Sequence, residues 1–114
     1  MATVETENEV LCGANSYEEK YYFNGKFANI PKDVQDELHA MCVLFTENVG
    51  GILTLEYLKD GTLVFRTIAD DYDFYYDEIE AGLQIRALQK EKEELLQALE
   101  LYYRTFILKE ASEG

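Results

Sequence analysis

The sequence predicts an α+β domain in which two helices pack on one face of a small antiparallel β-hairpin sheet. Apolar residues recur every three or four positions in two long segments, about 31–49 and about 77–108, which is the spacing of a helix face. Between them, two runs rich in β-branched and aromatic residues, about 52–58 and 62–69, flank a turn that contains glycine. The order helix, strand, strand, helix favours this layered arrangement.

The length and composition of the chain suit one domain. Its 114 residues are 47% hydrophobic, which is enough apolar surface for a single core. Residues 1–9 are polar, acidic and without a hydrophobic period, so we expect them to form a disordered tail. The expected domain covers residues 10–110, and residues 111–114 are expected to be a frayed C-terminus.

Acidic residues dominate the charge of the chain. It contains 23 Asp and Glu against 10 Lys and Arg, a formal net charge of -13, which repels nucleic-acid phosphates and anionic membrane surfaces. We therefore expect no direct nucleic-acid partner and no membrane partner. The N-terminus lacks the basic start of a signal peptide, and no apolar run approaches the roughly 18 residues of a membrane helix, so a cytoplasmic location is expected.

Residues 16–23 fit two structures. Ser16 and Glu19 have the spacing of a capping box, which predicts a short helix that ends near Tyr22 or Phe23. The aromatic residues of 19–23 also favour a strand, because such side chains pack well on a pleated surface. The sequence leaves both structures open.

The helix at 31–49 has a clear start, stripe and end. Pro31 suits the first turn, where its missing amide hydrogen costs nothing, and Gly50 with Gly51 ends the helix. Its apolar stripe consists of Val34, Leu38, Met41, Phe45 and Val49.

The register of the hairpin follows from the hydrophobic pattern. A two-residue turn at Asp60 and Gly61 would pair Leu55 with Arg66 and mix polar and apolar residues on both faces. A three-residue loop with a left-handed Gly61 instead gives one nearly apolar face. This preferred register pairs Leu53 with Thr67, Leu55 with Phe65 and Tyr57 with Leu63.

Residues 70–78 combine five acidic residues with four aromatic ones and lead into the last helix, for which Asp77 or Asp73 is the expected cap. Aromatic anchors inside a charged rim are enriched at protein contact surfaces, although such rings can also fill the edge of a thin core. The alternating acids are similar to the start of a calcium loop, but Tyr76 and Gly82 stand where that loop needs Gly and Glu. The candidate protein-contact residues are Asp70, Asp71, Tyr72, Asp73, Phe74, Tyr75 and Tyr76.

The last helix carries a heptad-like seam that indicates packing against another helix. Because two strands alone leave sheet edges open, a homodimer through this seam or through joined hairpins is the economical expectation. Lys92 interrupts the seam, either as a residue that fixes the register or as a side chain that extends to solvent. The candidate dimer seam consists of Ile85, Leu88, Lys92, Leu95, Leu99, Tyr102 and Phe106.

The cysteines and the histidine give no motif for catalysis or metal binding. Cys12, His39 and Cys42 lack the paired short spacings of a zinc site, and Cys42 lies on the core flank of its helix. No glycine-rich phosphate-binding pattern occurs. We expect reduced thiols, no catalytic residues, no metal and no cofactor.

The runs VLCGANSYEEKYYFNGKF, IPKDVQDELHAMCVLFTENVGGILTLEY and EKEELLQALELYY resemble a small family of uncharacterised proteins from Gram-positive anaerobic bacteria, a domain of unknown function. The resemblance covers nearly the whole chain after the acidic tail. It implies a bacterial cytosolic origin and assigns no activity to any residue.

Together these patterns favour a non-enzymatic, dimeric protein-binding or adaptor domain in the cytoplasm, with a basic protein as its partner. Three alternatives remain open at this point. A DNA-mimic inhibitor would present one continuous acidic stripe. A small-molecule sensor would have a lined cavity between helix and sheet. An enzyme would need Cys12 close to His39.

Overall fold

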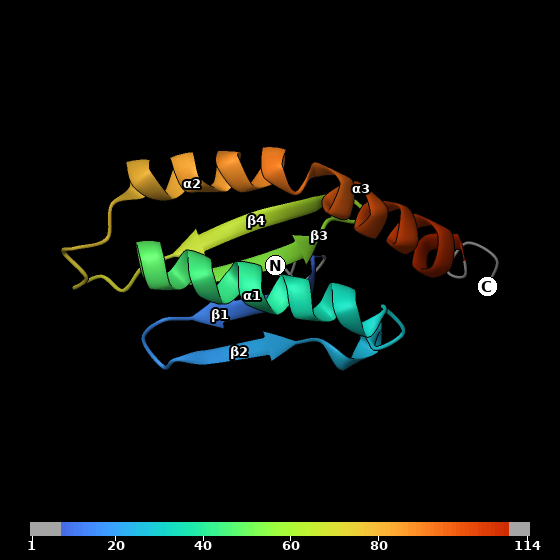
Figure 1. Cartoon of the computed structure of the whole chain (residues 1–114), viewed down its shortest axis with the longest axis horizontal. Coiled ribbons are helices and arrows are strands. Elements are labelled where there is room, and N and C mark those ends of the chain that lie inside the picture. Colours follow the sequence, from blue (N-terminus) through green and yellow to red (C-terminus); the bar gives the residue numbers. More distant parts are fainter. Residues whose placement is uncertain (1–7, 110–114) are drawn as a thin grey trace, which may run out of the picture.

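The computed structural model describes residues 8–109 and folds them into one antiparallel sheet with helices on a single face (Figure 1). This confirms the predicted α+β class. The sheet has four strands in the order β2-β1-β3-β4, so the first strand of the chain lies inside the sheet. The elements in chain order are β1 (Glu9–Asn15), β2 (Lys20–Phe23), the 3-10 helix η2 (Gly25–Phe27), α1 (Lys32–Val49), β3 (Ile52–Tyr57), β4 (Leu63–Ile68), α2 (Glu78–Glu91), α3 (Glu93–Tyr102) and the π-helix η3 (Tyr103–Leu108).

The N-terminal segment forms two of the four strands, and the helical alternative for 16–23 is wrong. Residues 16–19 make a turn, and the strand β2 follows it. The Asn15 side chain accepts hydrogen bonds from the backbone N–H groups of Tyr17 and Glu18 at 2.9 and 3.2 Å, so these amides are satisfied without a helix. Pairing of β2 with β1 satisfies the backbone that follows.

The N-terminal boundary also differs slightly from the expected one. Glu9 was placed in the tail, but it opens β1 and accepts bonds from Lys26 Nζ at 2.7 Å and from the Tyr103 hydroxyl at 3.1 Å. Asn8 was also placed in the tail, but its side-chain amide donates to Glu56 Oε1 at 3.2 Å. Residues 1–7 of the expected tail and the expected frayed C-terminus at 111–114 lie outside the described residues.

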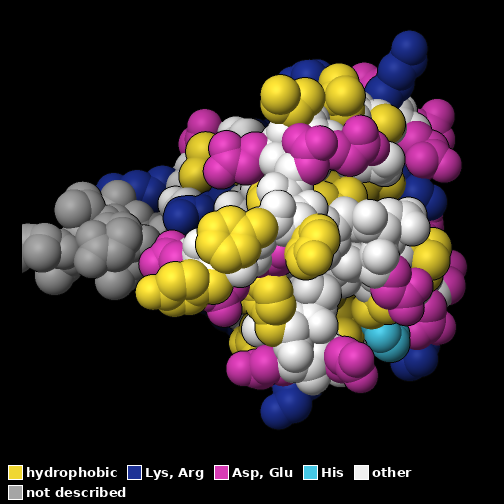
Figure 2. Space-filling view, turned by 90° about the vertical axis from the view of Figure 1, so that its left-hand side faces the viewer, with side chains coloured by type: hydrophobic (Ala, Val, Ile, Leu, Met, Phe, Trp, Pro, Cys, Tyr) yellow, Lys and Arg dark blue, Asp and Glu magenta, His cyan; other side chains and the backbone are white. Residues whose placement is uncertain are grey.

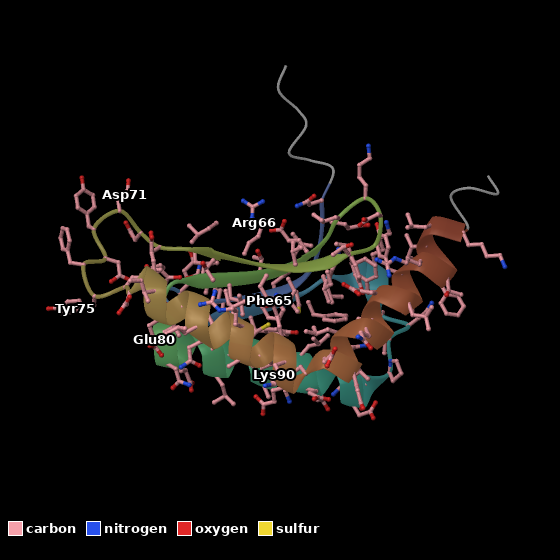
Figure 3. The ribbon with its side chains drawn as sticks, turned by 90° about the horizontal axis from the view of Figure 1, so that it is seen from above. Phe65, Arg66, Asp71, Tyr75, Glu80 and Lys90 are labelled. Carbon is pink, nitrogen blue, oxygen red and sulfur yellow. The ribbon has the colours of Figure 1, made fainter. Side chains whose placement is uncertain are left out.

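The predicted hairpin register is confirmed. Leu53 pairs with Thr67, Leu55 with Phe65 and Tyr57 with Leu63, and Gly61 has the left-handed φ of 90° that the three-residue loop requires. In this register, the apolar side chains of β3 and β4 share the face of the sheet that the helices cover. In Figure 3, the neighbours Phe65 and Arg66 of β4 extend to opposite sides of the sheet, and the helices lie only on the Phe65 side.

The core lies between this sheet face and the helices. Leu53, Leu55 and Tyr57 are fully buried, and α1 contributes its predicted stripe to the same core. β1 has a β-bulge between Val10 and Cys12, and its four residues from Leu11 to Ala14 are all buried. The buried residues of α1 are Leu38, Met41, Cys42, Phe45 and Thr46.

The long helix expected at about 77–108 is divided into α2, α3 and η3. It starts as predicted, because the Asp77 side chain accepts hydrogen bonds from the N–H groups of Ile79 and Glu80. The break lies at Lys92, whose φ of -104° is outside the helical region. It falls within the polar run 89–94, where no apolar stripe holds the helix on the core, and Lys92 Nζ instead bonds Glu37 Oε2 of α1 at 3.0 Å.

Candidate functional site

The loop 70–78 between β4 and α2 is held by short-range and long-range hydrogen bonds. Within the loop, the Asp73 N–H donates to the Asp70 carbonyl at 3.0 Å and the Asp73 side chain accepts from the Tyr75 N–H at 3.1 Å. Tyr17, in the turn between β1 and β2, donates its hydroxyl to Asp73 Oδ2 at 2.7 Å and accepts the Asp70 N–H at 2.9 Å. The acidic residues at the start of the loop thus fix its path.

The aromatic residues of the loop point into solvent. Tyr72 is 82% exposed, Phe74 is 85% exposed and Tyr75 is 97% exposed, so these rings are outside the core. Tyr76 is different, because its ring packs against the core and its hydroxyl is buried without a hydrogen-bond partner among residues 8–109. The rings of Tyr72, Phe74 and Tyr75 therefore do not fill the edge of the core, whereas the ring of Tyr76 does.

The hydrogen bond between Tyr17 and Asp73 perturbs the phenol. A carboxylate that accepts the phenolic proton favours the protonated form, so the hydrogen bond to Asp73 raises the pKa of Tyr17 above its usual range. Tyr17 therefore keeps the proton that it donates to Asp73 throughout the physiological pH range. Nothing in the local sequence identifies Tyr17 as the anchor of a loop more than fifty residues away, with separations of 53 and 56 residues in the two bonds.

The loop lies at one end of the molecule, next to the turn between β1 and β2 (Figure 1). Figure 2 looks onto this end, where hydrophobic side chains and Asp or Glu side chains alternate across the surface. Ile79, in the first turn of α2, adds to the exposed apolar area with 77% exposure. Exposed apolar side chains and acidic side chains therefore occur together at this end of the molecule.

The residues of the candidate dimer seam pack mostly within the chain. Leu99 is 3% exposed and belongs to the core, and Ile85, Leu88, Leu95 and Tyr102 pack against that core. Phe106 is the exception, with 56% exposure. Most residues of the seam therefore pack against the core of their own chain. Lys92, also a seam residue, lies at the break between α2 and α3.

Cys12, His39 and Cys42 are near one another without forming a catalytic arrangement. The Cys12 and Cys42 sulfurs lie 3.9 Å apart in the core, and both are free thiols. His39 stacks on the Tyr21 ring, with the ring centroids 4.2 Å apart and the planes 16° apart. Within residues 8–109, no hydrogen bond joins either thiol to His39, and no group of three His, Cys, Asp or Glu residues is placed to hold a metal ion.

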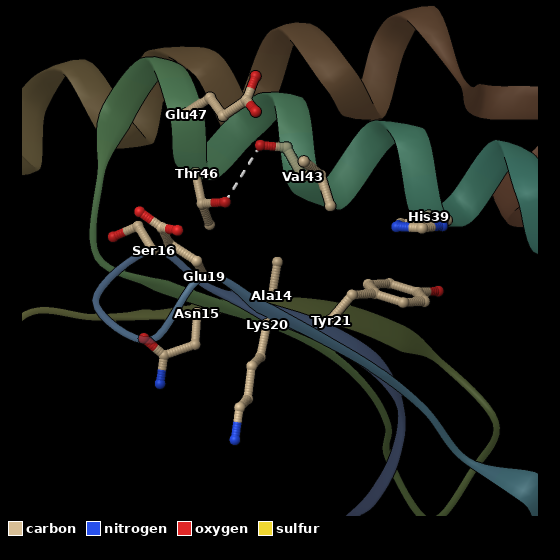
Figure 4. Close-up of a pocket in the computed structure, with 10 residues that line it drawn as sticks. All are labelled: Ala14, Asn15, Ser16, Glu19, Lys20, Tyr21, His39, Val43, Thr46 and Glu47. Carbon is tan, nitrogen blue, oxygen red and sulfur yellow. Dashed lines mark hydrogen bonds between the residues drawn. The ribbon is translucent and has the colours of Figure 1, made fainter.

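A cleft of 610 Å³ lies between the turn of the first hairpin and α1. Figure 4 shows Glu19 from the turn and Glu47 from α1 on facing walls, while Lys20 and Asn15 extend away from the space. The Tyr21 and His39 stack closes one end of it. Glu19 has a φ of 55°, a conformation that residues other than glycine seldom adopt. No sequence pattern indicates this cleft, because its walls meet only in the folded chain.

The fold and this site define a small acidic α+β domain with an exposed acidic aromatic loop. The chain belongs to the family of unknown function DUF6145, whose model matches residues 8–111. No curated protein and no solved structure matches the chain significantly. Within the described residues, no helix is both long and apolar enough to cross a membrane.

Proposed function

We propose that this protein is a non-catalytic binding domain that docks a basic protein segment on the loop 70–78. The observation that carries the proposal is the exposure of Tyr72, Phe74 and Tyr75, at 82%, 85% and 97%, on a loop that hydrogen bonds hold in one shape. Large exposed rings have no stabilising role in the free domain. Aromatic residues held in place lose little entropy on binding and commonly anchor interfaces.

The charge of the loop supports a partner rich in Lys and Arg. Its five carboxylates attract cations over about a Debye length and would steer a basic segment toward the rings. Lys and Arg side chains can then lie over the aromatic faces, which attract cations electrostatically. The mixture of acids with exposed rings favours a protein contact over a DNA mimic, in which rows of carboxylates would stand without protruding apolar groups.

The proposal can be tested with a library of random peptides displayed on phage and the whole protein as bait. We expect enrichment of basic peptides that also carry apolar residues. Replacing Phe74 and Tyr75 together by Ser should raise the dissociation rate constant of a selected peptide by 10- to 100-fold, about 1.4–2.8 kcal/mol. The matched control is Tyr22→Ser, which removes another exposed tyrosine, on β2 outside the loop, and should leave binding unchanged.

A second pair of variants separates charge steering from packing. The side chains of Asp71 and Glu78 make no hydrogen bond with described residues, so Asp71→Asn with Glu78→Gln keeps the loop's own bonds. This double change should slow association and flatten its salt dependence, with little effect on dissociation. Selection of peptides without basic residues, or equal binding by every loop variant, would contradict the proposal.

A second candidate function is the binding of a small organic cation in the cleft between the first hairpin and α1. The observation that favours it is the pair of carboxylates on facing walls, Glu19 and Glu47, neither of which forms an ion pair with another described residue. Titration with spermidine, followed by NMR of the His39 ring, tests this candidate. A response that Glu47→Gln weakens and Glu94→Gln leaves intact would support it, and the absence of any response would exclude this cation class.

The homodimer, the cytoplasmic location and the absence of nucleic-acid and membrane partners remain part of the proposal. The seam no longer motivates the dimer, because it packs inside the chain. The sheet argument is also weaker, since one chain provides four strands. What supports a second copy is the exposed apolar pair Leu101 and Phe106 on the last helices, at 64% and 56% exposure.

A further inference from the structure

The two cysteines of this chain meet in the core from different elements. Cys12 lies on β1 and Cys42 lies on α1, 30 residues later, and their sulfur atoms are 3.9 Å apart. Both side chains are fully buried, and no other cysteine occurs in the chain. Each thiol therefore has one possible partner within the molecule.

We propose that Cys12 and Cys42 are an oxidative modification site, at which hydrogen peroxide converts the two thiols into a disulfide that cross-links β1 to α1. The sulfurs are already in van der Waals contact, and a disulfide needs them at about 2.05 Å. Because the two residues come from separate elements, side-chain rotation and a small shift of α1 over the sheet can supply the remaining approach.

The surroundings of the pair distinguish the two thiols. The thiol of Cys42 can donate its hydrogen toward Cys12, and the Tyr21 hydroxyl also lies beside Cys12 without a well-formed hydrogen bond to any described residue. The Cys42 thiol, followed by the Tyr21 hydroxyl, lowers the pKa of Cys12 against the opposing effect of burial, while the same contact and burial raise the pKa of Cys42. Cys12 is thus the thiol that reacts first.

The reaction balances with one equivalent of peroxide. The Cys12 thiolate attacks one peroxide oxygen and breaks the O–O bond, which gives the sulfenic acid and, with the thiol proton, one water. The Cys42 sulfur then attacks the Cys12 sulfur, the S–O bond breaks, and the departing hydroxide takes the Cys42 proton to form a second water. Two thiols are oxidised by two electrons, and the peroxide is reduced to two waters.

The cleft provides a route for a small oxidant. Ala14, two residues after Cys12 on the same strand, and Val43, next to Cys42, both line it, as does Tyr21. Figure 4 shows Tyr21 and His39 stacked at the end of the cleft. Residues close in sequence to both cysteines therefore line the cleft, and a brief opening of the Tyr21 and His39 stack would let a peroxide molecule pass from the cleft toward the sulfurs.

The first test uses the intact wild-type protein with hydrogen peroxide. We expect a mass loss of about 2 Da, no alkylation by N-ethylmaleimide after unfolding, and a Cys12–Cys42 linked peptide in a non-reducing digest. The melting temperature should rise by roughly 5–15 °C and return after reduction, because the cross-link restricts the unfolded chain. Because this experiment uses only the wild-type protein, its result does not depend on whether a variant folds.

Two variants test the roles of Cys42 and Tyr21 in the reaction. Cys42→Ala should gain oxygen in steps of about 16 Da at Cys12 instead of forming the cross-link, and Tyr21→Phe should slow cross-linking several-fold without preventing it. The proposal is overturned if wild-type thiols stay fully alkylatable, if peroxide gives sulfinic acid without the cross-link, or if only disulfides between chains form.

Discussion

At the scale of single residues, the buried tyrosines show how this chain uses polar rings in its core. Tyr57 is fully buried, stacks on Tyr103 with ring centroids 4.1 Å apart, and donates its hydroxyl to the Leu99 carbonyl at 2.9 Å. Phe27 completes the cluster, with its centroid 5.6 Å from that of Tyr57. One ring thus joins β3 to the last helices by both packing and a hydrogen bond.

Tyr57→Phe should keep the packing and lose the hydrogen bond. The Leu99 carbonyl would keep the backbone N–H of Tyr103 as a donor and lose only the phenol, so we expect a loss of about 0.5–1.5 kcal/mol in the free energy of unfolding at pH 8. Chemical denaturation with urea, monitored by circular dichroism, gives this value. An unchanged free energy would mean that water replaces the phenol.

The same substitution should change the response to alkaline pH. Burial raises the pKa of Tyr57 well above its usual value near 10, so the phenol stays protonated in the folded state where it ionises in the unfolded state. Its contribution to stability is therefore complete below about pH 10 and is lost as the pH rises toward the folded pKa. Between pH 9 and 11, the wild type should lose about 1 kcal/mol more than Tyr57→Phe does, and equal losses would contradict the assignment.

At the scale of elements, the connection from α1 to β3 depends on two glycines with different surroundings. Gly50 and Gly51 both have positive φ, 88° and 73°. A Cβ atom at Gly50 would meet nothing within 4 Å, whereas at Gly51 it would lie 2.8 Å from the Ile68 carbonyl oxygen and 2.8 Å from the Tyr76 ring. This close approach brings Tyr76, at the end of the loop 70–78, against the start of β3.

The two glycines form a matched pair for mutation. Gly50→Ala should cost about 1 kcal/mol, which is the strain of a positive φ alone. Gly51→Ala should cost at least about 1 kcal/mol more, because the backbone carbonyl of Ile68 cannot move freely. Thermal denaturation of both variants measures the difference, and equal costs would show that the contacts at Gly51 relax without penalty.

At the scale of the whole molecule, one folded chain uses most of its apolar residues for its own two layers. Leu99 lies in the core, whereas Leu101 and Phe106 on the same helices are largely exposed. Of the predicted seam, Leu99 thus packs inside the chain and Phe106 stays on the surface, where Leu101, which lies outside the seam, is also exposed. Any second copy would meet Leu101 and Phe106.

This division gives a prediction for the oligomeric state. We expect a dimer in sedimentation equilibrium at micromolar concentration, which Leu101→Ser with Phe106→Ser converts to a monomer of unchanged fold. Leu99→Ala should instead lower the free energy of unfolding by about 2–5 kcal/mol, the usual cost of a buried leucine. A wild type that sediments only as a monomer would remove the dimer from the proposal.

The comparison of pattern and structure separates local from long-range information. The extent of α1, the register of β3 and β4 and the capping of α2 by Asp77 were predictable, because each depends on residues a few positions apart. The seam was predicted to pack against another helix, but an apolar stripe has the same pattern whether it meets a second chain or the rest of its own chain.

The sequence by itself determined the fold class, the hairpin register, the acidic charge and the composition of the loop 70–78, since these follow from periodicity, turn chemistry and residue type. Only the tertiary structure decided that residues 20–23 form a strand, because pairing with β1 outweighs the local helix signal. It also decided that Tyr17 anchors Asp70 and Asp73, and that Cys12 meets Cys42. These contacts join segments 30 to 56 residues apart, and chain folding sets such distances while local sequence patterns do not.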